Sequence, residues 1–226
     1  MDVMCFPFSK KTVVMVDPSR IRHAPPEWAR RVDELWQRRD PVQRLFDAPI
    51  VSVVQRMPDV ITGELVDFRL WYACRQDPEL SLVLDVHPLG ITGLTTWRSL
   101  VLVGRRSAAL SSYPGAMECC PSGSVDKVSV QKDGTVDLEK MFLTELVEET
   151  GIPRESVLSI QMKGLYLSTD TGVFDVAGAI ELSPNEDQPL SRPRSREYDE
   201  LQWIQKNQQA DQDWVPLSRL LLEGCL

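Results

Sequence analysis

Histidine and long apolar runs are scarce in this chain of 226 residues, and its cysteines are odd in number. Two histidines, His23 and His87, and five cysteines with no CxxC spacing give little support to a zinc site. Cys119 and Cys120 are neighbours in sequence, a poor arrangement for a structural disulfide, so we expect reduced thiols. No uninterrupted apolar run approaches the ~18 residues of a membrane span, so we expect no membrane partner.

Positive charge is also in deficit, because the formal net charge is −8. A nucleic-acid-binding surface needs an electropositive stripe, so we expect no nucleic-acid partner. A small phosphorylated substrate is not excluded, since a few local cations and a bound metal ion can reverse the sign inside one cleft. The N-terminus lacks the basic start and long apolar core of a secretory signal, so the predicted localisation is cytoplasmic.

Carboxylates are plentiful, and three of them fall within the segment 144–152, Thr-Glu-Leu-Val-Glu-Glu-Thr-Gly-Ile. On a helix, Glu145 and Glu149 stack on one face with Glu148 beside them. Such like charges repel, but they become favourable around a hard divalent cation that also grips phosphate. Gly151 supplies a left-handed stop for the helix. The segment therefore predicts a metal–diphosphate site, and the alternative for an acidic run is a solvated helix face.

The surroundings of this segment resemble the Nudix box. A buried strand at 100–103 is followed by a turn-rich loop with Gly123, and then by the acidic helix ending Glu-Glu-Thr-Gly-Ile. Every position that the family's pattern specifies from Glu145 to Ile152 is satisfied. The resemblance implies an α/β/α sandwich with a central mixed β-sheet, which the alternation of strands and helices along the chain also predicts.

The box is divergent at three points. Thr144 stands where the family has arginine, and Val136 falls where it has an isolated upstream glutamate. Gly123 lies seven residues further from the helix than in the family's pattern. An insertion within 124–136, with Asp133-Gly134 as its turn, would account for the difference. The missing arginine normally orients a neighbouring glutamate, so its loss puts the rate of any reaction in question.

Short strings elsewhere are similar to one Nudix branch, the UDP-glucose pyrophosphatases of animals, over about residues 28–152. That branch also lengthens the loop before the helix and lacks the box arginine. The matching strings are 45–49 (Leu-Phe-Asp-Ala-Pro), 87–90 (His-Pro-Leu-Gly), 102–107 (Leu-Val-Gly-Arg-Arg-Ser), 114–115 (Pro-Gly) and 121–123 (Pro-Ser-Gly).

The resemblance implies that Mg2+, with Mn2+ as the alternative ion, is held by Glu145 and Glu149. Glu148 is the third ligand or an orienting carboxylate, and Glu145 or an acid from another loop is the general base. The catalytic pair predicted is therefore Glu145 and Glu148. Further candidate acids are Glu197, Glu200 and Asp126, each of which has a solvated surface position as its alternative.

Arg105 and Arg106 leave a buried strand side by side, so alternation sends one toward the cleft and the other away. We expect one of them to clasp phosphate near Gly123, against the alternative that both are surface charges. Asp137 is expected to cap the acidic helix rather than to replace the missing glutamate. Trp97 and Tyr113 are candidates to stack on a base, with a core position as the alternative.

The expected organisation is an N-terminal helical and β elaboration at 1–92 and a Nudix domain at 93–226. The first segment, to about Leu45, is predicted to be mostly helical, with a helix start at Pro25-Pro26. We expect 87–93 and 183–196 to be loops and 214–222 to be a terminal helix. Predicted strands are 50–54, 63–70, 80–84, 100–103, 164–167, 173–182 and 198–204.

The leading functional hypothesis is hydrolysis of a UDP-sugar such as UDP-glucose to UMP and a sugar 1-phosphate. One alternative keeps the chemistry and changes the substrate to another nucleoside diphosphate conjugate, of the ADP-ribose type. A second is a catalytically weakened module that binds a ligand or a protein. The expected partner is a small nucleotide diphosphate, and the sequence makes no prediction of oligomeric state.

Overall fold

The computed structural model describes residues 3–9, 11–41, 45, 48–184, 197–206 and 213–224. Within these ranges one mixed sheet has eight strands, in the order β1-β9-β10-β5-β6-β11, with β7 beside β6 and β8 beside β5. Its strands are β1 (Val3–Phe6), β5 (Leu89–Trp97), β6 (Leu100–Arg106), β7 (Met117–Cys119), β8 (Ser122–Ser124), β9 (Val157–Ser168), β10 (Val173–Leu182) and β11 (Tyr198–Gln205).

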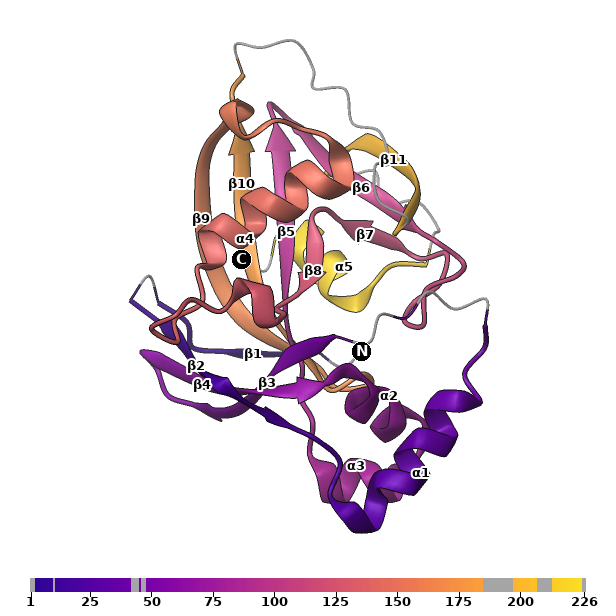
Figure 1. Cartoon of the computed structure of the whole chain (residues 1–226). Helices are drawn as coiled ribbons and strands as arrows, with labels where there is room; N and C mark the ends of the chain where they lie inside the picture. Colours follow the sequence, from indigo (N-terminus) through magenta and orange to yellow (C-terminus); the bar gives the residue numbers. More distant parts are fainter. Residues whose placement is uncertain are drawn as a thin grey trace.

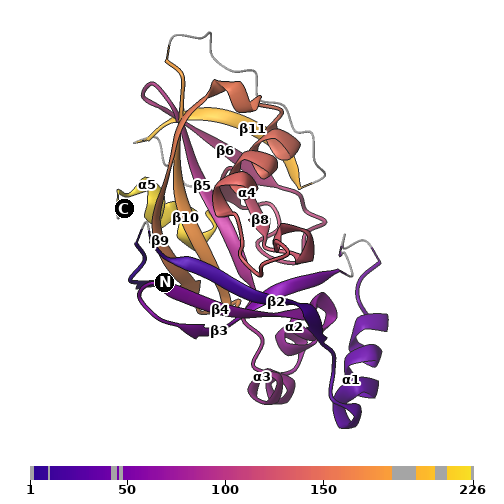
Figure 2. The same cartoon turned by 60° about the vertical axis from the view of Figure 1, so that its left-hand side comes forward.

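Helices cover both faces of this sheet. On one face lies α4 (Leu138–Glu145), which continues without a break into the π-helix η2 (Leu146–Thr150). On the other lies α5 (Pro216–Leu222), and Figure 2 shows the two on opposite sides of β5 and β10. Neighbouring residues of β10 divide between the two cores: Ile180 packs with Phe142 of α4, and Ala177 packs with Leu221 of α5. The expected α/β/α sandwich with a central mixed sheet is confirmed.

A second, three-stranded sheet and three helices come from the N-terminal part and gather at one end of the large sheet (Figure 1). The strands are β2 (Val13–Arg22), β3 (Pro49–Arg56) and β4 (Val60–Asp67), and the helices are α1 (Pro26–Gln37), α2 (Phe68–Gln76) and α3 (Pro78–Leu84). The helices share a core of their own, built around Val32, Leu70 and Leu80. The remaining short helices are η1 (Lys127–Ser129) and η3 (Arg154–Ser156).

Several sequence expectations for the N-terminal half were wrong. The first 22 residues contain strands rather than helix, because β1 pairs with β9 at the edge of the large sheet and β2 pairs with β4. Residues 80–84 belong to α3, whose start is marked by Pro78 and by the Asp77 side chain, which accepts hydrogen bonds from two backbone amides. Phe68 to Leu70 likewise begin α2 instead of ending a strand.

The segment 87–93, expected to be a loop, contains the start of the central strand β5. Its two glycines suggested a loop, but both occupy the strand because neighbouring groups come too close for a side chain. A Cβ on Gly90 would lie 2.5 Å from an oxygen of Asp175, and one on Gly93 would lie 2.5 Å from Pro121. Glycine in a strand interior often marks such a close approach.

The expectations around the acidic helix hold. The Asp137 side chain accepts a hydrogen bond from the backbone amide of Lys140 and caps α4. Gly151 ends the helix in the left-handed region, with φ of 75°. Asp133-Gly134 forms a turn in the long loop before the helix, and Gly134 has φ of 87°.

The proposed boundary between 92 and 93 falls within β5, and the division into 1–92 and 93–226 stays a prediction. Within 45–49, residues 46 and 47 lie outside the described residues, as does most of the loop expected at 183–196. No helix in the described part of the chain is long and apolar enough to cross a membrane.

Candidate functional site

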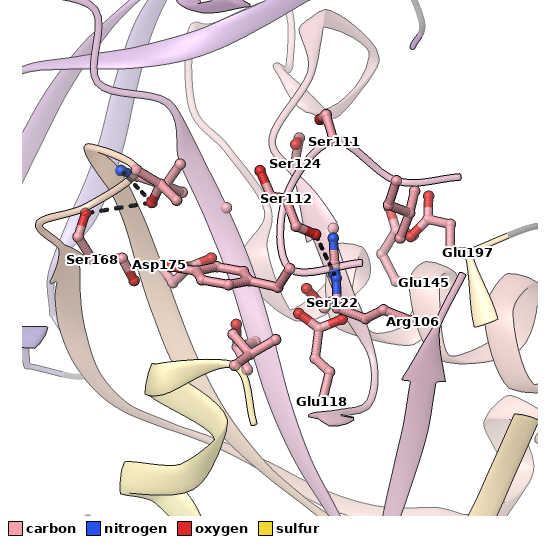
Figure 3. A pocket seen from close by; sticks show the side chains of 18 of the residues that line it. Arg106, Ser111, Ser112, Glu118, Ser122, Ser124, Glu145, Ser168, Asp175 and Glu197 are labelled. Atoms are coloured by element: carbon pink, nitrogen blue, oxygen red, sulfur yellow. Dashed lines mark hydrogen bonds and ion pairs between the residues drawn. The ribbon is translucent and has the colours of Figure 1, made fainter. Parts of the chain in front are cut away.

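A cavity of about 400 Å³ opens between the end of the acidic helix, strand β8, the loop after β6 and helix α2. Figure 3 shows its walls: Glu145 and Glu197 lie on one side, Asp175 and Ser168 on the other, and Arg106 and Glu118 between them. Gly123, Asp126, Glu148 and Tyr113 also line it, as do Phe68 and Trp71 of α2.

Glu149 is 2% exposed and is not among the lining residues, but its carboxylate contacts Ser122, which is. Its Oε2 accepts a hydrogen bond from the backbone amide of Ser122 at 3.1 Å, while its Oε1 is buried and has no hydrogen-bond donor among the described residues. Burial raises the pKa of this carboxyl well above its usual range, with further contributions from the negative charges of Glu197 and Glu145. A buried acceptor with no donor is costly, and a cation is one way to satisfy it.

Glu145 is held against the glycine loop. A Cβ on Gly123 would lie 2.8 Å from the Glu145 carboxyl carbon, so glycine is the residue that leaves room for this carboxylate. Burial, followed by the charges of Glu197, Glu148 and Asp126, raises its pKa to about 7. The transition from α-helix to π-helix comes directly after Glu145, and π-turns inside helices are frequent at functional sites.

The structure separates the other candidate acids. Glu148 is exposed but lines the cavity, and Asp126 lines it while its side chain accepts hydrogen bonds from Ser129. Glu197, just before β11, turns its carboxyl to the cavity, where desolvation raises its pKa and the proximity of Glu149 lowers it. Glu200 is not among the lining residues.

The two arginines divide as the strand alternation predicts. Arg106 lines the cavity and donates to Glu118 at 2.6 Å, in an ion pair whose side chains are 14% and 5% exposed. The Tyr198 hydroxyl donates to the same Glu118 oxygen at 3.0 Å, and Arg106 Nε donates to the carbonyl of Ser112. Arg105 is not among the lining residues, and its Nε lies 3.8 Å from a Glu200 oxygen.

Sequence reasoning missed Glu118 and Asp175. Asp175 is the acid of an otherwise apolar stretch of β10, and it lines the cavity opposite Glu145. Burial raises its pKa to about 7, with a smaller rise from the charge of Glu118, while Arg106 and a hydrogen bond with Thr92 lower it. A lone carboxylate within a buried strand was the available signal.

The aromatic and thiol candidates have clear positions. Trp97 is 7% exposed and packs near Trp203 in the core, so its core alternative holds. Tyr113 lines the cavity, and its hydroxyl donates to Asp170. Burial raises the pKa of both thiols of the Cys119-Cys120 pair, which makes them poor nucleophiles.

Charge sets what this cavity can hold. Six carboxylates line its described wall, on Glu118, Asp126, Glu145, Glu148, Asp175 and Glu197, against one arginine, Arg106. A diphosphate would be repelled unless divalent cations entered with it. No group of three or more His, Cys, Asp or Glu in the described residues is assembled as a ready-made metal cage.

The two divergent box positions have structural explanations. Val136 is buried in the core and does not line the cavity. Thr144 accepts a hydrogen bond from Arg154 through its hydroxyl at 3.1 Å, and it does not line the cavity.

No protein-family model and no curated protein matches the chain, whereas solved structures do. DR0079 from Deinococcus radiodurans is 16% identical with a TM-score of 0.50, over 78% of this chain and 98% of that one. This likeness shows a shared fold. The Nudix hydrolase RenU from M. smegmatis is 17% identical with a TM-score of 0.43, over 61% and 81% of the two chains. The Nudix domain of Shewanella oneidensis NrtR, solved with ADP ribose, is 16% identical with a TM-score of 0.46, over 67% and 92%.

Proposed function

We propose that the chain is a Nudix-type hydrolase that requires Mg2+, or Mn2+ in its place, and cleaves a UDP-sugar such as UDP-glucose to UMP and a sugar 1-phosphate. The observation that carries the metal-dependent chemistry is the buried Oε1 of Glu149, which has no hydrogen-bond donor among the described residues and lies near Glu145, a residue that lines a cavity with six carboxylates and one arginine. The narrower assignment to UDP-sugars is supported by the strings at 45–49, 87–90 and 102–107.

The residues present fit a divalent ion. Glu145 and Glu149 would hold it, and Glu148 at the cavity wall would be a third ligand or would orient the other two carboxylates. When bound, the ion neutralises the diphosphate and lowers the pKa of coordinated water. The Ser122 amide fixes one oxygen of Glu149 and leaves the other available. Gly123 admits the carboxylate of Glu145.

Arg106 is the cavity's cation for a phosphate oxygen. Its guanidinium is already fixed by Glu118 and the Ser112 carbonyl, so the remaining donor edge is pre-oriented and loses little freedom on binding. The general base would be Glu145 or a second acid that faces the same space, and the position of Glu197 at the cavity wall supports Glu197 as that acid. Glu200 and Arg105 are the weakest of the sequence candidates, since neither lines the cavity.

The test is incubation of purified protein with UDP-glucose and Mg2+, followed by chromatography of the nucleotides. We expect UMP that disappears with EDTA and with Glu149→Gln. Glu139→Gln is the matched control, since it makes the same change at an exposed site in the first turn of the same helix. It should retain full activity.

Cleavage of ADP-ribose but not UDP-glucose would replace the substrate and keep the chemistry. Failure to cleave either, with a control enzyme active alongside, would refute hydrolysis. Protection by Mg2+ against thermal unfolding in that case would leave a metal-binding module without turnover.

A further inference from the structure

The cavity continues well beyond the acidic helix. Asp175, Ser168 and Thr171 line the side opposite Glu145, and Figure 3 places Arg106 between the two sides. A diphosphate bound at Glu145 and Arg106 would leave the side of the cavity lined by Asp175 for one of its attached groups. The side chains around Asp175 therefore indicate which attached group this side of the cavity would bind.

The position of the Asp175 carboxylate is defined by its neighbours. Asp175 on β10 is the register partner of Gly90 on the parallel strand β5. A Cβ on Gly90 would lie 2.5 Å from Asp175 Oδ1, so the missing side chain creates the space that the carboxylate occupies. Thr92, which is also on β5 and is buried, lowers the pKa of this carboxyl. A carboxylate braced in this way presents its remaining acceptor sites to the cavity.

The groups around Asp175 favour a hydroxylated, uncharged ligand. Ser168 and Thr171 add hydroxyls to the wall, and Arg106 is the one basic residue among the described lining residues. A carboxylate repels phosphate and accepts strongly from neutral donors. Burial brings the pKa of Asp175 to about 7, so near neutrality it can either accept or donate, as a sugar hydroxyl can.

We propose that the Asp175 end of the cavity is a sugar subsite, in which the Asp175 carboxyl hydrogen-bonds to hydroxyls of a sugar attached to the diphosphate and selects for them. The inference rests on the proposed function and adds a specificity-determining residue to it. The sugar is either the conjugated hexose or the nucleoside ribose, and the two have the same hydroxyl chemistry.

Two stripped substrates distinguish these sources. The first is the methyl ester of UDP, in which methyl replaces the hexose. The second is UDP-glucose with a 2′,3′-dideoxyribose. Values of kcat/KM are measured for both and for UDP-glucose, with wild type, Asp175→Asn and Asp175→Ala. Glu181→Gln is the control, since Glu181 lies on the same strand, is exposed and does not line the cavity.

We expect wild type and Glu181→Gln to discriminate by about 10- to 100-fold against one of the stripped substrates, the value of a hydrogen bond to a charged group. In Asp175→Ala that discrimination should shrink to about threefold or less. Removing the hydroxyls from the substrate and removing the carboxyl from the protein abolish the same hydrogen bond, so the second change costs little once the first is made. The substrate on which it shrinks identifies the sugar. Should the alanine variant fail to fold, the nearly isosteric asparagine variant decides by the same comparison.

Discrimination that is unchanged in the Asp175 variants, with UDP-glucose still cleaved, would overturn the inference and leave the proposed function standing. Failure of wild type to cleave UDP-glucose would overturn the proposed function and the inference with it.

Discussion

Replacing Glu145 by glutamine should stabilise the metal-free protein while it removes metal binding. The pKa of Glu145 rises from 4.5 to about 7, chiefly because the carboxyl is buried and also because Glu197 is near. A shift of one unit is worth about 1.36 kcal/mol, so the full shift corresponds to roughly 3 kcal/mol. Because Glu145 is only half-buried, solvent screening reduces this, and we expect about 1–3 kcal/mol.

The sign follows from proton binding. Between 4.5 and about 7, the folded protein retains a proton on Glu145 that the unfolded chain has lost. The free energy of unfolding therefore falls as pH rises through this window and stays low above it. Glutamine does not titrate, so the advantage of Glu145→Gln should be absent near pH 4 and complete near pH 8.

Thermal unfolding in EDTA across this pH range measures the effect. For a chain of this size, about 1–3 kcal/mol corresponds to a rise in Tm of roughly 2–12 °C near pH 8. Added Mg2+ should raise the Tm of wild type and leave that of Glu145→Gln unchanged. The difference in Tm between the two proteins should therefore become smaller or change sign. The exposed Glu139→Gln should behave as wild type throughout. A variant less stable than wild type at pH 8 in EDTA would show that the native contacts of this carboxylate outweigh its burial, and would refute the reasoning.

Three further substitutions test other parts of the site. Arg106→Ala should cost about 3–5 kcal/mol in urea unfolding, because it leaves Glu118 buried with the Tyr198 hydroxyl in place of an ion pair, and an unchanged midpoint would contradict this. Gly123→Ala should lower kcat by at least about tenfold and the free energy of unfolding by less than about 1 kcal/mol, because the new Cβ meets the flexible end of Glu145 and displaces its carboxylate. Full activity would show that catalysis does not need the Glu145 carboxylate in this position. Asp137→Ala should cost about 1 kcal/mol by removing the cap of α4, with activity retained at permissive temperature, and a loss of activity without a loss of stability would indicate a direct role.

The sequence predicted correctly those features that depend only on residues close to one another along the chain. The acidic helix has its cap at Asp137 and its stop at Gly151, both expected from residue type, and the strand at 173–182 has the expected bounds. The change of the acidic helix to a π-helix after Glu145 was not predicted, because no residue in 146–150 signals the wider turn.

Expectations failed where distant segments decide the outcome. The start of β5 looked like a loop because its glycines are explained only by Asp175 and Pro121, which lie far along the chain. Glu118 drew no attention, since its importance comes from pairing with Arg106 and Tyr198. Spacing along the chain contains no information on such partners, so an isolated acid inside a strand was the most that could have been noticed.

The two glycines nearest the cavity connect the sequence resemblance to the chemistry. Gly90 lies in the string at 87–90 and Gly123 in the string at 121–123, and they stand on paired strands, with Gly90 opposite Ser124 and Ile91 opposite Gly123. Each leaves open the space that one carboxylate fills, Asp175 at one end of the cavity and Glu145 at the other. Glycine weakens a strand, since it adds no packing and loses more conformational freedom on folding. Their presence in adjacent central strands is therefore explained by the carboxylates, and a side chain at either position should disturb one end of the cavity and spare the other.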